Sequence, residues 1–153
     1  NKSKLTLLRE TIKTDTNINI LIAKSLIKKG YKKIGVLGLS YKGNLKVNIL
    51  SPVIPFIRYL KSKGVNVNLF DPYYSSKEIN QIVGVKSFKY PKDLSKFDCI
   101  VISIDHKEFK TNMKSIIKYL PKCRFILDNM KVWEKIDFPK HITYKISGEK
   151  NWI

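Results

Sequence analysis

A chain of 153 residues is long enough to bury one hydrophobic core and too short for two domains of ordinary size. Apolar residues make up 43% of it, as in a globular protein, and no apolar run approaches the roughly 20 residues that cross a bilayer, so a soluble protein without a membrane span is expected. The formal net charge of +18 implies nonspecific attraction to phosphates and brings nucleic acid into consideration as a partner.

The chain opens with a predicted long helix. Between residues 5 and 29 apolar side chains recur at spacings of three and four, and an interruption near residues 14–16 also fits the pattern. Gly30 is a natural helix stop. The apolar stripe is wide for a leading helix, so it could pack on this domain, on another domain or on a second copy.

A strand, a loop and a helix follow. Residues 33–38 are short, β-branched and ended by glycine, which indicates a buried strand. Ser51 fits a helix cap and Pro52 a first helical turn. Residues 39–50 are therefore predicted to be a loop between a strand and a helix amino terminus.

The rest of the chain continues the alternation. Ser75 and Glu78 resemble a capping box that opens a short helix, and another helix is predicted over residues 111–120. Further strands are predicted at residues 65–70, 85–88, 98–104, 124–128 and 141–145. Such alternation indicates an α/β fold with an open, mainly parallel, Rossmann-like sheet and helices on both faces, here preceded by a long helix. Ligands of such sheets bind at the carboxyl ends of the strands.

The loop at residues 39–50 is the leading candidate for a site. Free backbone N–H groups and the helix dipole favour an anion at a helix amino terminus. Lys42 could reach a phosphate or a developing negative oxygen from this loop, and the alternative is one more solvated lysine. Neither the Walker pattern nor the spacing of the dinucleotide fingerprint is present.

Other polar residues follow the predicted strands. Asp71 stands where a dinucleotide fold often meets a ribose hydroxyl, and Asp-Pro also makes a good turn, so both interpretations stay open. The pair Asp105 and His106 could supply an acid or base, although a loop-capping Asp beside a surface His is the favoured interpretation. His141 stands alone at the start of a predicted strand.

The charge distribution argues against a dedicated nucleic-acid face. The chain has only three arginines, Arg9, Arg58 and Arg124, whereas base and phosphate recognition favours the arginine fork. The lysines are spread along every predicted element, which favours a solvated surface. Specific binding to nucleic acid is therefore not expected.

The cysteines and histidines do not form a metal-binding pattern. Cys99 and Cys123 lie in apolar, strand-like runs and are expected to be buried thiols in a reducing compartment, which indicates the cytoplasm. Two cysteines and two histidines are too dispersed for a zinc site, so no metal is expected.

Several motifs occur in a recognisable order. Gly-Val-Leu-Gly-Leu-Ser-Tyr-Lys ends at Lys42 and is followed by Asn44 and Ser51-Pro52. Phe-Asp-Pro-Tyr at residues 70–73, the segment 98–110, Ile-Leu-Asp at 126–128 and the segment 144–148 come later. Together they closely resemble the carboxy-terminal domain of the UDP-glucose/GDP-mannose dehydrogenase family. The leading helix is similar to the end of the central helix through which these enzymes dimerise. The resemblance divides the chain into residues 1–30, the end of that helix, and residues 31–153, a UDP-sugar-binding domain.

The resemblance implies a role in a two-domain site. The complete family enzyme oxidises the primary alcohol of a nucleotide-linked sugar to a carboxylate, with two NAD and a cysteine thioester. Lys42 matches the lysine that contacts the sugar and stabilises negative charge, and Tyr41 matches the aromatic residue beside it. The amino-terminal domain that binds NAD and carries the catalytic cysteine is missing here. This chain alone is therefore expected to bind a UDP-sugar, to dimerise through its leading helix and to be inactive without that partner domain.

The sequence also departs from the family pattern. Lys46 and Val47 stand where the family usually has an acidic pair, and Ile49 stands where it has an arginine that approaches the cofactor. Met130 occupies the place of an arginine that meets the sugar nucleotide, for which Lys131 could substitute as a point charge. Two alternatives to a dehydrogenase domain follow: a binding or interaction module that has lost catalysis and, from charge alone, a nucleic-acid-binding domain.

Overall fold

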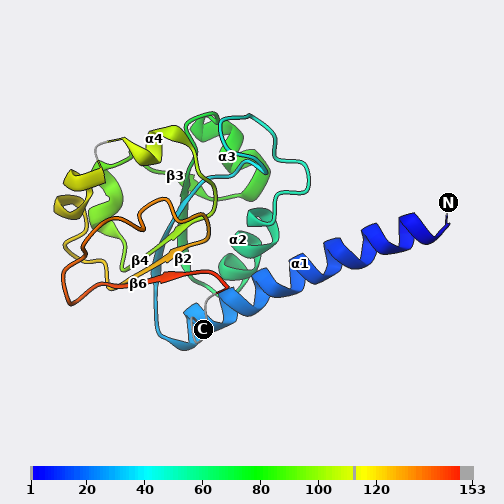
Figure 1. Ribbon diagram of the computed structural model, residues 1–153, viewed down its shortest axis with the longest axis horizontal. Helices are drawn as coiled ribbons and strands as arrows, with labels where there is room; N and C mark the ends of the chain where they lie inside the picture. Colours follow the sequence, from blue (N-terminus) through cyan, green and yellow to red (C-terminus); the bar gives the residue numbers. More distant parts are fainter. Residues whose placement is uncertain (1, 112, 149–153) are drawn as a thin grey trace.

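The computed structural model describes residues 2–111 and 113–148 and contains a six-stranded, wholly parallel sheet with the order β3-β2-β1-β4-β5-β6 (Figure 1). The strands are β1 Lys33–Leu37, β2 Asn66–Phe70, β3 Lys86–Ser87, β4 Cys99–Ile102, β5 Phe125–Asp128 and β6 Thr143–Ile146. The helices are α1 Lys2–Lys28, α2 Val53–Ser62, α3 Ser76–Val83 and α4 Lys107–Lys110, with 3₁₀ segments at Lys92–Lys96 and Met113–Tyr119. The predicted α/β class with a Rossmann-like sheet is confirmed.

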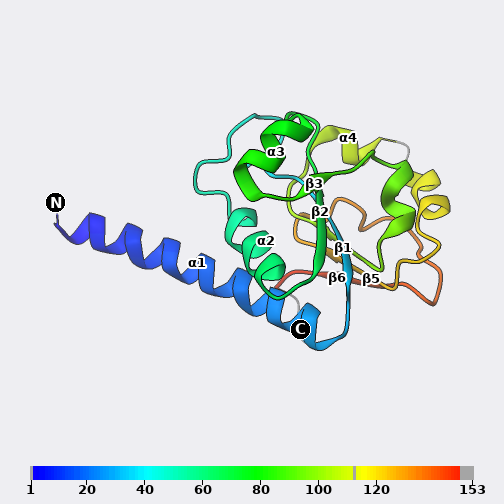
Figure 2. The same cartoon turned by 180° about the vertical axis from the view of Figure 1, so that it is seen from behind.

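Helices cover both faces of the sheet (Figures 1 and 2). Because successive side chains in a strand point to opposite faces, alternate residues of β4 enter two different hydrophobic clusters. Cys99 and Val101 face the cluster under α1, α2 and α3, while Ile100 and Ile102 face the cluster under α4, the 3₁₀ segments and the chain after β5. Because all the strands run parallel, their carboxyl ends lie along one edge of the sheet, hereafter the rim.

Helix α1 runs without a break from Lys2 to Lys28, so the predicted interruption near residues 14–16 is wrong. The Thr14 hydroxyl donates to the carbonyl oxygen of Glu10 at 2.8 Å, a local hydrogen bond that accommodates a threonine within a helix. The carboxyl-terminal part packs on α2 through Ile22 and Leu26, both buried. Figure 1 shows the amino-terminal half extending away from the domain.

Two glycines of the first strand unit are required by close contacts. A Cβ on Gly35 would lie 2.6 Å from the ring of Phe97, so only glycine lets β1 approach that ring. Gly38 has φ +99°, and a Cβ there would lie 2.8 Å from Cβ of Ile104. Gly35 thus lets the Phe97 ring pack against the middle of β1, and Gly38 lets the chain leave β1 directly beside Ile104.

Several predicted boundaries change. Residues 111–120 do not form one α-helix, since α4 ends at Lys110 and a 3₁₀ segment covers Met113–Tyr119. Ser51 is not the cap of α2, because Pro52 holds that position and the buried Ser51 hydroxyl only accepts a long bond, 3.4 Å, from Val53 N. The capping box of α3, made by Ser75 and Glu78, is confirmed. Among the described residues, no helix is long and apolar enough to cross a membrane.

Candidate functional site: an anchored loop on the rim

The loop at residues 39–50 leaves β1 at the centre of the rim, between the ends of β2 and β4. Its first two residues, Leu39 and Ser40, are fully buried. Tyr41 and Lys42 are exposed, with Tyr41 retaining 57% of its accessible surface. The loop therefore changes abruptly from core to solvent at the two residues that the family resemblance selects.

The buried side chain of Asp71, at the end of β2, holds the start of this loop. Its Oδ2 accepts from Leu39 N at 2.7 Å, from Ser40 N at 3.1 Å and from the Ser40 hydroxyl at 3.2 Å. Oδ2 also faces His106 Nε2 at 3.1 Å, and Oδ1 accepts from Tyr73 N at 2.9 Å. Of the two interpretations of Asp71, the structure supports the turn and loop role, because its oxygens are already occupied by protein donors.

The ionisation of Asp71 follows from these contacts. Burial by itself raises the pKa of Asp71, but the hydrogen bonds from His106, Leu39 and Tyr73 outweigh it, and the pKa lies below the usual 3.8. Asp71 is therefore a buried carboxylate at neutral pH, and protein hydrogen-bond donors rather than solvent stabilise its charge.

His106 is wholly buried, so the favoured interpretation of a surface histidine is wrong. Its Nε2 faces Asp71, and its Nδ1 accepts from Asn44 N at 2.9 Å. The ring lies between Tyr73 and Phe109, with ring centroids 5.0 Å and 5.4 Å away. Both nitrogens are occupied by the protein, which leaves none for proton exchange with a bound ligand.

The far side of the loop tip is also fastened. Asn44 has φ +59°, and its side-chain oxygen accepts from Lys107 N at 2.9 Å. Gly43 lies directly against the carboxylate of Asp105, where a Cβ would clash. Sequence reasoning missed Asn44 and His106 as partners. A signal was present, because Asn tolerates positive φ and His106 follows a strand whose end shares the rim.

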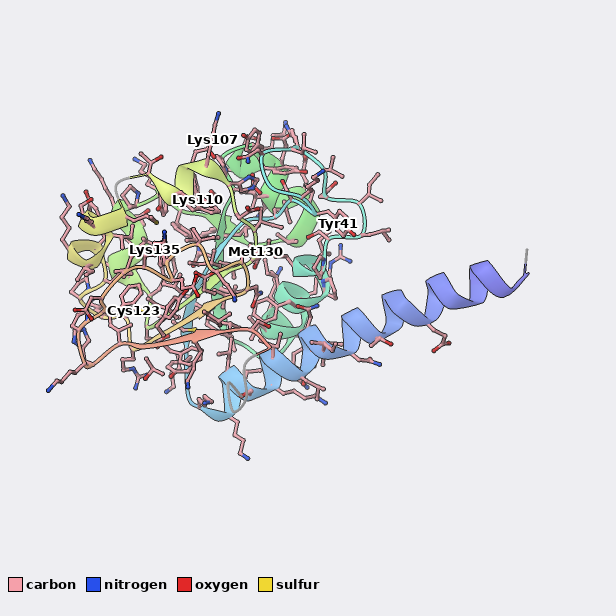
Figure 3. The ribbon with its side chains drawn as sticks, in the orientation of Figure 1. Tyr41, Lys107, Lys110, Cys123, Met130 and Lys135 are labelled. Carbon is pink, nitrogen blue, oxygen red and sulfur yellow. The ribbon has the colours of Figure 1, made fainter. Side chains whose placement is uncertain are left out.

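Lys42 is presented at the tip of this fastened loop. Within the described part of the chain, its ammonium group has neither a hydrogen bond nor an ion pair. Figure 3 shows the neighbouring Tyr41 at the periphery of the loop, with Lys107 on α4. An unpaired cation on a rigid support is suited to bind an anionic group of a ligand.

The second half of the loop is apolar and exposed. Ile49 keeps 75% of its accessible surface, and Leu45, Val47 and Leu50 are also exposed. Lys46 is the exception, since it pairs with Glu78 of α3. Two departures from the family pattern, Val47 and Ile49, thus lie in an exposed apolar segment, and a third, Lys46, ties this segment to α3 by an ion pair.

Lys131 lies on the turn after β5, which places it across β4 from the strand that leads to Lys42. The buried Asp128 holds this turn by accepting from Met130 N and Trp133 N, at 3.0 Å and 2.8 Å. Lys131 is exposed with φ +57°, and Met130 keeps 42% of its accessible surface. The structure thus places Lys42 and Lys131 on the same rim but on different loops.

The rim also contains a small hollow near β4. It encloses about 300 Å³, including the solvent at its mouth, and is lined by Asn19, Pro52, Phe56, Ser103 and Asn129 among others. A larger hollow of about 670 Å³ lies at the opposite, amino-terminal edge of the sheet, beside Lys33, Lys86 and Lys96. Hollows of about 770 Å³ beside Arg58 and of about 710 Å³ beside Tyr90 are larger still, so hollow size does not select a site, whereas the position of ligands in open parallel sheets favours the rim.

The cysteines supply no reactive thiolate. Both are free and buried, which confirms the prediction of buried thiols. Burial raises the pKa of Cys123 to about 12 and that of Cys99 well above its ordinary value. Among the described residues, no group of three or more His, Cys, Asp or Glu side chains could hold a metal ion.

Fold and site together define a Rossmann-like α/β domain whose rim presents an exposed lysine on a fastened loop. The chain belongs to the UDP-glucose/GDP-mannose dehydrogenase family, and residues 35–135 match its UDP binding domain. The resemblance found in the sequence is thereby confirmed.

The proteins to which this chain is similar are named as dehydrogenases of UDP-linked sugars. The chain is 29% identical to the UDP-N-acetyl-D-mannosamine dehydrogenase of Methanococcus aeolicus, over 94% of this chain and 35% of that protein. It is 25% identical to the UDP-N-acetyl-D-glucosamine 6-dehydrogenase of Salmonella typhi, over 72% of this chain and 27% of that protein. The solved UDP-D-ManNAc dehydrogenase of Pyrococcus horikoshii matches 82% of this chain and 28% of its own, with 27% identity and a TM-score of 0.59. The chain therefore spans about a quarter to a third of the length of the curated relatives that it matches.

Proposed function

We propose that this chain is the sugar-nucleotide-binding domain of an NAD-dependent UDP-sugar 6-dehydrogenase and that its site is the anchored loop at Tyr41 and Lys42. The observation that carries the proposal is the ammonium of Lys42, which has no ion pair with the residues that the structure describes and is presented by a loop fastened on both sides of it. Family membership supplies the ligand class, and the relatives' names supply the reaction.

Each proposed residue has a separate physical role. Lys42 contributes a point charge to an anionic group or a developing negative oxygen of the ligand, and Tyr41 contributes an exposed aromatic face for packing. Lys131 approaches from the β5 side and contributes a second charge without the bidentate geometry of an arginine. The surrounding charge of +18 adds a long-range attraction for phosphates.

The residues of this chain do not fit NAD. A dinucleotide fold holds the pyrophosphate on a short glycine-rich turn and uses a free acidic side chain for the ribose. Here residues 39–50 form a longer loop, and Asp71 is buried with both oxygens already accepting from protein donors. Cys99 and Cys123 are buried thiols and do not suit a nucleophile. We therefore assign NAD binding and thioester chemistry to the amino-terminal domain of the complete enzyme.

The test is calorimetric titration of the chain with UDP and with UDP-N-acetylmannosamine. A hydrogen bond to a charged group contributes about 1.5–3 kcal/mol, so Lys42→Ala should weaken binding about tenfold to a hundredfold. Lys122→Ala removes an equal charge from the opposite end of β5 and should leave affinity within about twofold. Absence of binding at millimolar ligand would refute the proposal, and tight, salt-sensitive binding to DNA would favour the nucleic-acid alternative.

A binding module without catalysis is the second candidate, because the exposed Ile49 and Met130 stand where the family pattern has arginines. A chimera in which residues 35–135 replace the matching segment of the Methanococcus aeolicus relative separates the two. NAD reduction by the chimera with UDP-N-acetylmannosamine supports the dehydrogenase domain. UDP binding without NAD reduction supports the module.

Homodimerisation through α1 is part of the proposal. Ile18 and Leu21 keep 46% and 56% of their accessible surface on this helix, although both are large apolar residues. Burying them against a second copy would remove apolar surface from water and stabilise the pair.

A further inference from the structure

We propose that His106 is a positioning residue for Lys42: held in its neutral Nε2–H tautomer, it joins Asp71 to Asn44 and so fixes both ends of the three-residue tip that carries the lysine. The inference rests on the proposed function for its ligand, but the connection itself is a property of this chain. Nothing in the proposed chemistry requires His106 to touch the ligand.

The contacts of His106 determine its tautomer. The backbone N–H of Asn44 can only donate, so Nδ1 of His106, 2.9 Å away, must carry the lone pair. The remaining proton is then on Nε2 and is donated to the carboxylate of Asp71 at 3.1 Å. A second proton on Nδ1 would face the Asn44 N–H and break this connection.

The connection closes a ring around the loop tip. Asp71 holds Ser40 on one side of the tip, and His106 holds Asn44 on the other. Asp71 and His106 also contact each other, which joins the two anchor points. Along the chain, only Tyr41, Lys42 and Gly43 lie between the anchored residues. Few backbone conformations can span fixed ends so close in sequence. The position of the Cα of Lys42 is therefore restricted.

The surroundings of His106 make the connection rigid. The ring is fully buried between the rings of Tyr73 and Phe109. Water cannot readily replace the imidazole there, and an apolar substitute would leave the Asn44 N–H without its acceptor. The same burial excludes contact between the imidazole and a ligand, so His106 acts only through the loop.

Two substitutions separate positioning from filling of space. His106→Gln retains a carboxamide that can accept from Asn44 N and donate to Asp71, whereas His106→Leu fills similar volume without either group. Amide hydrogen exchange at Asn44 reports the anchor directly. We expect slow exchange in the wild type and in His106→Gln, and exchange at least tenfold faster in His106→Leu.

Nitrogen-15 NMR of the imidazoles tests the tautomer without any ligand or substitution. The chain contains two histidines, and His141→Asn assigns the signals. We expect His106 to have a non-protonated Nδ1 and a protonated Nε2 at neutral pH. An Nδ1–H tautomer or an imidazolium would overturn the inference, as would unchanged Asn44 exchange in folded His106→Leu. If that variant does not fold, retention of slow exchange in His106→Gln supports the inference and loss of slow exchange contradicts it.

Titration with UDP connects the anchor to the proposed function. Affinity should fall at least tenfold in His106→Leu and stay within about threefold in His106→Gln. Binding by all variants with equal affinity overturns the positioning role. Absence of UDP binding by the wild type refutes the proposed function instead, while exchange and tautomer still decide whether the anchor exists.

Discussion

Replacement of Asp71 tests whether the rim is built around a buried carboxylate. In Asp71→Ala, the backbone N–H groups of Leu39 and Ser40 and Nε2–H of His106 lose their acceptor while buried. Each unpaired buried donor destabilises a fold by about 1–3 kcal/mol. Three such donors together give about 3–9 kcal/mol, so we expect the free energy of unfolding to fall by at least about 3 kcal/mol, which belongs to the severe range for single substitutions.

Asp71→Asn is a milder version of the same change. The amide oxygen can occupy the place of Oδ2 and keep its four buried donors, but the amide nitrogen then opposes Tyr73 N–H and the negative charge is lost. We expect a loss of about 1.5–3 kcal/mol in urea unfolding at pH 7. Asp137→Asn, at an exposed carboxylate, is the control and should change the free energy by less than about 0.5 kcal/mol.

The dependence on pH provides a second readout for Asp71. Because its folded pKa lies below 3.8, ionisation favours the folded state, and the contribution is complete above the ordinary pKa and is lost as the pH falls through the folded pKa. The difference in stability between wild type and Asp71→Asn should therefore stay constant down to about pH 4 and narrow as the pH falls further. Equal stability of the two proteins at pH 7, or a difference that does not change with pH, would refute the reasoning.

Three further predictions concern packing, thiols and assembly. Gly35→Ala should lower the free energy of unfolding by about 1–3 kcal/mol in urea titrations, because the added Cβ meets the buried ring of Phe97, and a fully stable variant would contradict that contact. A thiol reagent at pH 8 should label Cys99 and Cys123 in urea much faster than in the native protein, since burial keeps both protonated, and rapid native labelling would count against this burial. Leu21→Glu should shift sedimentation toward the monomer if α1 pairs two copies, whereas a wild-type chain that is monomeric at high concentration would argue against that assembly.

The layers of the fold were predictable because local signals agreed with one another. The short β-branched runs, the glycine stops and the capping box at Ser75 each report on a few neighbouring residues. The long α1 was predicted for the same reason. The interruption that the pattern also allowed near residues 14–16 does not occur, and Thr14 makes its own hydrogen bond to Glu10 within the helix.

The contacts of the site could not be derived from the sequence in the same way. Lys42 was identified from its place after β1, but the support beneath it depends on Asp71 and His106, which are 35 residues apart in sequence. Their proximity requires the strand order that places β1 between β2 and β4, and local patterns do not specify that order. The expectation of a surface histidine failed for this reason.

The departures from the family pattern have a structural consequence in the loop. Lys46 occupies a position where the family usually has an acidic residue, and its ammonium pairs with Glu78 and lies 5.2 Å from the centroid of the Tyr74 ring. An acidic residue at this position would oppose Glu78 rather than bind it. The replacement thus fastens the second half of the loop to α3, while Ile49 remains exposed.

The most direct test of the central claim is a map of backbone amide NMR shifts during titration with UDP. The anchored-loop account predicts that Tyr41, Lys42 and Lys131 shift together and saturate with one dissociation constant. Shifts centred instead on Lys86 and Lys96, at the amino-terminal edge of the sheet, would contradict it, and so would a spectrum that UDP leaves unchanged.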